Sequence, residues 1–112
     1  MAVMQKVSLE ALARQQLANA AANGRNAADT VVGGHERVLR QTVIGMTAGS
    51  ELGEHENPGE ATLYVLKGAV RLVAGDQQWD ARAGDLLMIP DSRHSLLAVS
   101  DAALLLTVAK LP

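Results

Sequence analysis

The sequence predicts an antiparallel β-sandwich or β-barrel preceded by one N-terminal helix. Beyond residue 30, short apolar runs follow one another with turn-forming residues between them. Runs of this length at such regular spacing are typical of all-β sandwiches and barrels. With 112 residues, the chain has room for a single core. We therefore expect residues 1–30 to form a helix and a connector, and residues 31–112 to form one β-domain.

The expected helix begins after Ser8 and ends at Asn23-Gly24. Apolar residues from Leu9 to Ala20 recur at helical spacing. The Ser8 hydroxyl can accept from free backbone amides at the start, and a glycine tolerates the left-handed conformation at the end. The polar face of this helix is not basic, so the pattern favours packing on a barrel wall or across a dimer interface over binding to a membrane surface.

The apolar runs after the helix are the expected strands. They are residues 38–46, 62–66, 69–74, 77–81, 86–89, 95–99 and 102–109. Lys67-Gly68 and Gly75-Asp76 each lie between two runs, where a two-residue hairpin turn needs a positive φ. Both dipeptides are therefore predicted to be hairpin turns.

The composition argues against several classes of protein. The formal net charge is −2 with no run of Lys or Arg, so no nucleic-acid surface is expected. The absence of cysteine excludes disulfides and thiol chemistry. The longest apolar run, residues 102–106, is far shorter than the roughly 20 residues that span a bilayer. Residues 1–10 carry no apolar signal core, so we expect a cytoplasmic protein without a membrane partner.

One segment resembles the first motif of the cupins. Residues 49–68 read GSELGEHENPGEATLYVLKG, in which Gly49, His55 and Gly68 stand at the spacings of that motif. In this pattern the two glycines are turn formers, and the histidine belongs to the part that carries chemistry.

A second segment resembles the second cupin motif. Residues 84–94 read GDLLMIPDSRH, in which Gly84 and Pro90 fit, while His94 follows one residue earlier than the common pattern places it. The short gap between the two motifs is similar to that of small single-domain bacterial cupins of the RmlC-like superfamily, cupin-2 type. The resemblance implies an antiparallel jelly-roll β-barrel.

The resemblance also implies a metal site, but its ligand set is incomplete in this chain. In metal-bearing cupins, three histidines and one glutamate hold a divalent ion. His55 matches the first histidine, Asn57 stands at the second, Ala61 stands at the glutamate, and His94 matches the last only if one residue is deleted. Glu60 lies next to the lost glutamate. We therefore expect no firmly held cofactor, with Zn, Fe, Mn or Ni at partial occupancy on His55, His94 and Glu60 as the alternative.

The same residues also fit a pocket without a metal. His55, Asn57 and His94 would be polar groups around an apolar cavity in the barrel mouth, which is the general form of a small-molecule site. Either histidine could act as a general acid or base. An inward arginine would indicate an anionic ligand, and the alternation leaves open whether Arg37 or Arg40 faces inward.

These observations predict a small cupin that binds a small polar metabolite, with weak catalysis or none. The alternative is a metal-dependent enzyme, such as a dioxygenase, isomerase or decarboxylase. A third hypothesis is a sensory or regulatory module without a DNA-binding element of its own. Because exposed edge strands in small barrels are often covered across a two-fold axis, we also expect a homodimer.

Overall fold

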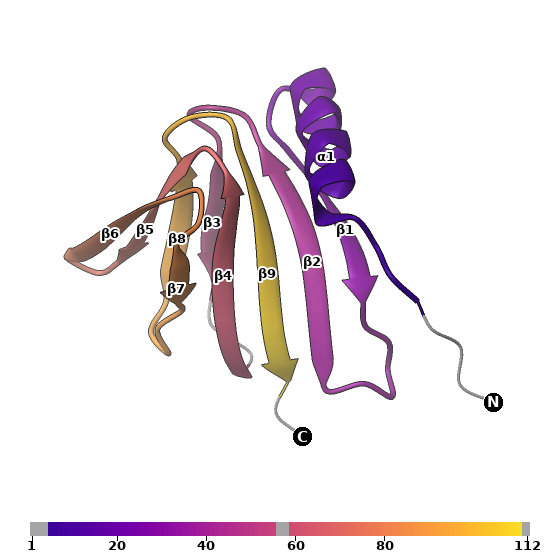
Figure 1. The fold of residues 1–112 in the computed structure, drawn as a ribbon. Helices are drawn as coiled ribbons and strands as arrows, with labels where there is room; N and C mark the ends of the chain where they lie inside the picture. The colour runs from indigo at the N-terminus through magenta and orange to yellow at the C-terminus, as the bar shows by residue number, and fades with distance from the viewer. Residues whose placement is uncertain (1–4, 56–58, 111–112) are drawn as a thin grey trace.

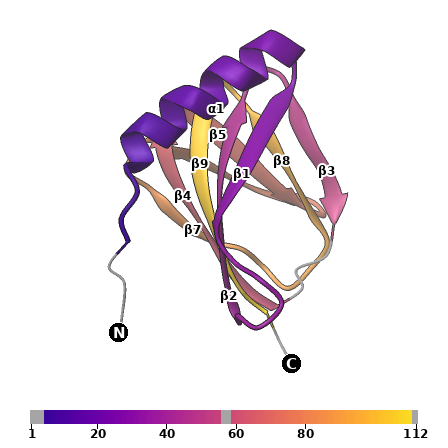
Figure 2. The ribbon, with the colours of Figure 1, turned by 90° about the vertical axis from the view of Figure 1, so that its right-hand side faces the viewer.

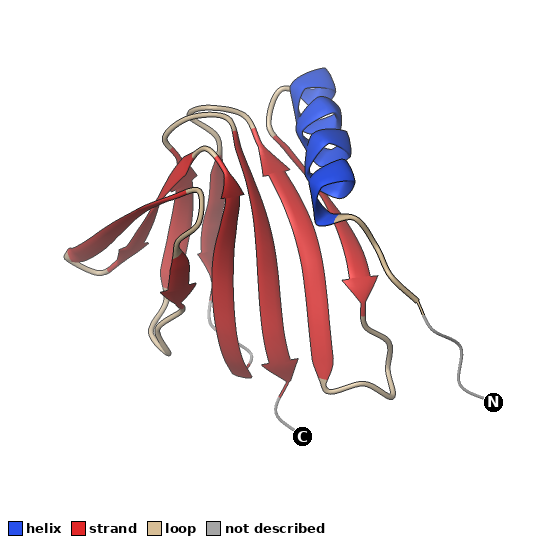
Figure 3. Cartoon of the chain, in the orientation of Figure 1, coloured by secondary structure: helices blue, strands red, loops and turns tan. Residues whose placement is uncertain are grey.

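One helix and nine strands make up the described part of the chain, residues 5–55 and 59–110, in a computed structural model (Figures 1 and 3). For Glu54 and His55 the backbone alone is described. The elements are α1 (Leu9–Asn23), β1 (Asn26–Val32), β2 (Leu39–Met46), β3 (Glu51–His55), β4 (Gly59–Lys67), β5 (Ala69–Ala74), β6 (Gln77–Arg82), β7 (Leu86–Met88), β8 (His94–Ala98) and β9 (Ala102–Lys110). No helix within these residues has the length and apolarity needed to span a membrane.

The strands form two antiparallel sheets that face each other. The first has the order β1-β2-β9-β4-β7, and the second has the order β3-β8-β5-β6. Neighbours in the sheets are often distant in sequence: β9 pairs with both β2 and β4, and β8 pairs with both β3 and β5. The predicted antiparallel jelly roll with one N-terminal helix is confirmed.

The helix begins and ends where the sequence predicts. The Ser8 hydroxyl accepts from the backbone N–H of Ala11 at 3.1 Å, which satisfies one of the free amides of the first turn. At the other end, Gly24 has a φ of 80° and its N–H donates to the carbonyl of Ala20 at 2.8 Å.

The helix packs against the outer face of β1 and β2, at one end of the strands (Figure 2). Its buried residues are Ala13, Gln16 and Ala20. The contact is close because β2 carries Gly45 there: a Cβ at this position would collide with the backbone of Gln16 and lie 2.7 Å from the Leu17 nitrogen. A glycine is therefore required for the helix to approach this closely.

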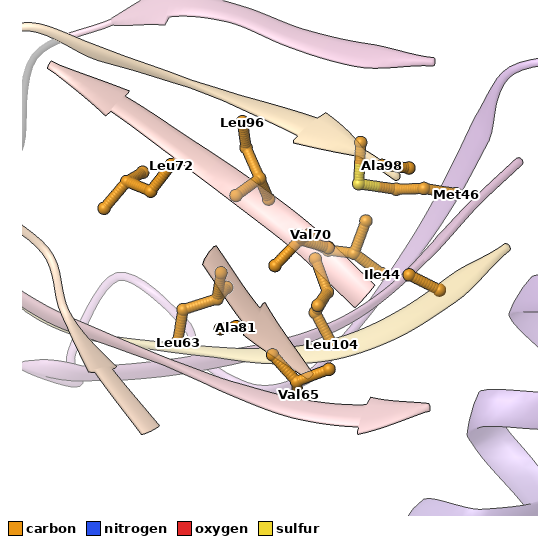
Figure 4. Close-up of a cluster of buried hydrophobic side chains, with 11 residues drawn as sticks. Ile44, Met46, Leu63, Val65, Val70, Leu72, Ala81, Leu96, Ala98 and Leu104 are labelled. Carbon is orange, nitrogen blue, oxygen red and sulfur yellow. The ribbon is translucent and has the colours of Figure 1, made fainter. Parts of the chain in front are cut away.

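The core lies between the two sheets, near the end that the helix covers. Its members are aliphatic, as a chain with almost no aromatic residues requires. Val65, Val70, Met46 and Leu104 have no exposed surface, and they come from four different strands (Figure 4). These side chains hold the two sheets together by burying apolar surface.

Two strands were not predicted. β1 begins at Asn26, so it crosses the expected boundary at residue 30 and belongs to the first sheet. β3 contains two glutamates and a glycine in five residues. Both strands lie at the edge of a sheet. Edge strands are partly solvated, so they can form from residues that show no apolar run.

One of the two predicted hairpin turns is wrong. Gly75-Asp76 joins β5 to β6 as expected, because Ala74 pairs with Gln77. Lys67-Gly68 instead carries the chain from β4 in the first sheet to β5 in the second. Gly68 does have a positive φ of 76°, but the reason is a sheet crossing in which a Cβ would collide with the carbonyl oxygen of Asp101.

Candidate functional site

A cavity of about 420 Å³ opens between the two sheets. Both sheets contribute to its wall. The apolar lining residues are Ile44, Leu52, Ala61, Leu63, Leu72, Ile89, Leu96, Leu106 and Val108. The polar lining residues are Thr30, Arg40, Thr42 and His94. An apolar cavity of this size with a few polar groups is the usual form of a small-molecule site.

The strand register of the first sheet shows how the cavity is oriented. Residues in register lie side by side across the sheet, and each row below faces the interior. The outermost row is Arg40, Val108 and Ala61, the next is Thr30, Thr42, Leu106 and Leu63, and the innermost is Ile44, Leu104 and Val65. Arg40 is exposed, whereas Ile44 and the rest of the innermost row are buried. The cavity is therefore open at the Arg40 end and closed at the end under the helix.

His94 is the first residue of β8 and is 4% exposed. Its Nδ1 lies 2.9 Å from the carbonyl oxygen of Ser92. A carbonyl oxygen can only accept, so Nδ1 must carry the proton in this hydrogen bond. In the neutral ring, Nε2 then holds the lone pair. This is the tautomer in which a histidine coordinates a metal or accepts a proton through Nε2.

The backbone places His55 beside His94. The two residues are register partners in the β3–β8 pairing, after an irregularity that follows Leu52. Two residues that are 39 positions apart in the sequence are thus adjacent across the second sheet. The side chain of His55 is not described. Asn57, the other polar residue predicted for this part of the site, lies outside the described residues.

Ala61 and Glu60 are placed differently by the alternation of β4. Ala61 lines the cavity in the outermost row, beside Val108. Glu60 is exposed and is not among the lining residues. Successive residues of a strand point to opposite faces, so one of this pair must turn away from the cavity. The structure therefore brings Ala61 and His94 together at the cavity, but not Glu60.

The structure resolves which arginine belongs to the cavity. Arg40, on β2, lines it, whereas Arg37 lies in the loop before β2, where its N–H donates to the carbonyl of Gly34 at 3.2 Å. Thr30 and Thr42 also line the cavity and were not predicted from the sequence. Thr42 lies two positions after Arg40 on β2, so its side chain points to the same face of the sheet as that of Arg40. Thr30 belongs to β1, a strand that was not predicted.

The described donors do not complete a cupin metal site. In the described residues, no three His, Cys, Asp or Glu side chains form a group that could hold a metal ion. The described part of the cavity lining offers the imidazole of His94 and no carboxylate, with Ala61 at the glutamate position of the motif. Stable sites for these metals use three or four protein ligands.

An ion pair on the second sheet shifts the pKa of both of its members. On β5 and β6, the register partners Arg71 and Asp80 form an ion pair with Nε and Oδ1 2.7 Å apart. The side-chain hydrogen bond from Arg71 lowers the pKa of the Asp80 carboxyl, and the same bond raises the pKa of Arg71. Neither residue lines the cavity, so the pair stabilises the hairpin and leaves the site unaffected.

Comparisons with known proteins agree with this architecture. A conserved protein of unknown function from Streptococcus pyogenes superposes with a TM-score of 0.71 at 27% identity, covering 79% of this chain and 76% of that one. An RmlC-like cupin from Desulfovibrio desulfuricans gives a TM-score of 0.68 at 28% identity, with coverages of 78% and 84%. A mutant of salicylate 1,2-dioxygenase from Pseudoaminobacter salicylatoxidans shares the fold, with a TM-score of 0.73 at 20% identity over 89% of this chain and 32% of that one.

The sequence itself identifies the family. None of the curated proteins matches the chain. The family model described as a cupin domain matches residues 42–109, which is more than half of the chain. These residues contain both motif segments, most of the strands and most of the cavity wall. The chain therefore belongs to the cupin family.

Proposed function

We propose that this cupin binds a small polar metabolite in the cavity between its sheets. The observation that carries the proposal is the composition of the wall: among its described residues, four polar side chains stand among nine apolar ones around a cavity of about 420 Å³. A wall of this kind excludes water from the body of a ligand while a few groups fix its orientation. The incomplete ligand set favours binding, or weak catalysis by His94, over metal chemistry.

Blocking the cavity tests this proposal. Ala61 and Glu60 are neighbours on β4, but only Ala61 lines the cavity. We expect Ala61→Phe to abolish the binding of small molecules, measured by ligand-observed NMR with short-chain acids, alcohols and amines. Glu60→Phe adds the same ring on the exposed side and should leave binding unchanged. Binding that survives equally in both variants would place the ligand elsewhere and contradict the proposal.

A metal-dependent enzyme is the second candidate, and one observation favours it. The register pairs His55 with His94, so two imidazole-bearing residues are adjacent at the open end of the second sheet. One structural neighbour is a dioxygenase, although at 20% identity this similarity shows the fold alone. Elemental analysis of protein purified without a metal-affinity tag separates the two candidates. Near-stoichiometric Zn, Fe, Mn or Ni that disappears in His55→Ala would support the enzyme and overturn our first choice.

We also propose that the protein forms a homodimer through the outer face of β4 and β7. Leu86 is 50% exposed and Met88 is 72% exposed, and Tyr64, the register partner of Leu86, is 37% exposed. Large apolar side chains clustered beside a short edge strand are typical of protein interfaces. Light scattering should give a dimer for the wild type and a monomer for Met88→Glu. A wild-type monomer at micromolar concentration would contradict the proposal.

A further inference from the structure

We infer that the ligand of the cavity is a small aliphatic carboxylic acid whose carboxylate is held at the mouth by Arg40. This inference rests on the proposed small-molecule function and names the chemical class of the ligand. It comes from three features of the described wall: one cation without a carboxylate, a pair of hydroxyl groups beside it, and an aliphatic interior.

Among the described lining residues, Arg40 is the one with a permanent charge, and none is Asp or Glu. Arg40 forms no ion pair with another described residue; the Arg71–Asp80 pair lies elsewhere, on β5 and β6. A guanidinium group presents parallel N–H donors in a fork that matches the two oxygens of a carboxylate. A described wall with this cation and no carboxylate favours a negatively charged ligand.

Thr30 and Thr42 add hydrogen-bonding capacity next to Arg40. Their hydroxyl oxygens are 3.1 Å apart, and they are register partners on β1 and β2. Each hydroxyl has one proton, so when one donates to the other, the second proton remains available to a ligand. Thr42 lies two residues along β2 from Arg40, about 7 Å away on the same face. A carboxylate between them can therefore accept from both.

The rest of the wall determines the body of the ligand. From Arg40 to Ile44, the lining extends along β2 by four residue-to-residue steps, which is about 13 Å of depth. The two aromatic residues of the sequence, Tyr64 and Trp79, are not among the lining residues. Aliphatic walls bury alkyl groups by the hydrophobic effect and provide no ring for stacking. The guanidinium of Arg40 is the one fixed charge of the described wall, so we expect a ligand with one carboxylate.

The experiment compares three probes of equal chain length: hexanoate, hexanol and hexylamine. Binding is measured by NMR titration, following the methyl signals of Ile44 and Leu63 inside the cavity. We expect hexanoate to shift these signals at the lowest concentration, and hexylamine at the highest. Because Arg40 is exposed, hexanoate binding should also weaken as salt is added.

Substitutions at Arg40 then test its role. Arg40→Gln should weaken hexanoate binding by about 10- to 100-fold, the usual effect of losing a charge-assisted hydrogen-bonded pair, and should hardly change hexanol binding. Arg40→Lys keeps the charge but loses the fork, so the loss should be smaller. The matched control is Arg37→Gln, which removes an arginine outside the lining and should leave all three affinities unchanged. Unchanged thermal midpoints show that the variants are folded.

The outcomes separate this inference from the proposed function. If hexanol binds as tightly as hexanoate, or if Arg40→Gln binds hexanoate like the wild type, the carboxylate inference is overturned while small-molecule binding stands. If none of the probes shifts the cavity methyl signals, both are overturned. If hexylamine binds best, the mouth selects cations and the inference is again overturned.

Discussion

The two ends of the sandwich are built from the same strands but differ in packing. At the end under the helix, β2 is buried from Val43 to Met46, and Leu104 and Val65 fill the space between the sheets with no exposed surface. At the opposite end, the same strands leave the cavity of about 420 Å³, and β2 is exposed at Arg40.

This difference indicates that the stability of the fold and the proposed ligand binding depend on different ends of the sandwich. Packed aliphatic side chains stabilise the fold at the closed end, where each lost methylene group leaves a void. At the open end, aliphatic side chains already border free space, so they are available to a ligand. Matched substitutions on the two sides of this division should therefore differ in their effect on the free energy of unfolding.

The largest expected effect comes from two leucines on β9. Leu104→Ala creates a void in the closed end and should lower the free energy of unfolding by about 3–4 kcal/mol. Leu106 lies two residues further along and lines the cavity. Its replacement by alanine should cost about 1–2 kcal/mol, because fewer packing contacts are lost. Urea denaturation of both variants measures the difference, and equal costs would contradict the division into two ends.

The second comparison makes the same glycine-to-alanine substitution in two strands, β2 and β3. Gly45→Ala places a methyl group against the backbone of the helix, so it should cost about 2 kcal/mol and lower the helical signal in circular dichroism. A Cβ at Gly53 of β3 meets no atom of the described residues within 4 Å. Gly53→Ala should therefore be neutral or slightly stabilising. A thermal midpoint that falls equally in both variants would contradict the close approach of the helix.

His94 should affect binding more than stability. His94→Gln removes the hydrogen bond to the Ser92 carbonyl, which should cost about 1 kcal/mol in the free energy of unfolding. The same variant should lose binding of any ligand that contacts Nε2. Parallel chemical denaturation and NMR titration measure the two effects. A large loss of stability with unchanged binding would make His94 a structural residue.

The smallest effect is expected far from both ends, at the ion pair of Arg71 and Asp80. The pKa of Asp80 is lowered in the folded state, so its contribution to stability is present above the unfolded pKa of about 3.9 and is lost as the pH falls through the folded value. Both groups are exposed, and such pairs contribute little. Asp80→Asn should change the thermal midpoint only slightly at pH 7 and not at all at strongly acidic pH.

The sequence predicted most of the fold because its signals are local. The capped helix and the strands with apolar runs follow from residues that lie close together in the chain. β1 and β3 were missed since edge strands such as Asn26–Val32 need no apolar run. The crossing at Gly68 was mistaken for a hairpin because both uses require a positive φ. Local patterns do not show which sheet a strand joins.

The candidate site was less predictable because it depends on register. The motif resemblance selected His55 and His94, but only the β3–β8 pairing shows that they are adjacent. The alternation of side chains along the strand could not show whether Arg37 or Arg40 faces the cavity, because the inner face of a single strand is known only once its partner strands are placed. Thr30 could not be found at all, because its strand was not predicted.

The position of β9 in the first sheet has a consequence for how the molecule forms. This strand lies between β2 and β4, and it contributes Leu106 and Val108 to the cavity. Until residues 102–110 leave the ribosome, β2 and β4 have no common neighbour and the cavity does not exist. Contacts so distant along the chain make folding slow, and nascent chains with unpaired strands are vulnerable to aggregation. The pairing of residues 102–110 with both of its neighbours is thus the step that creates the cavity.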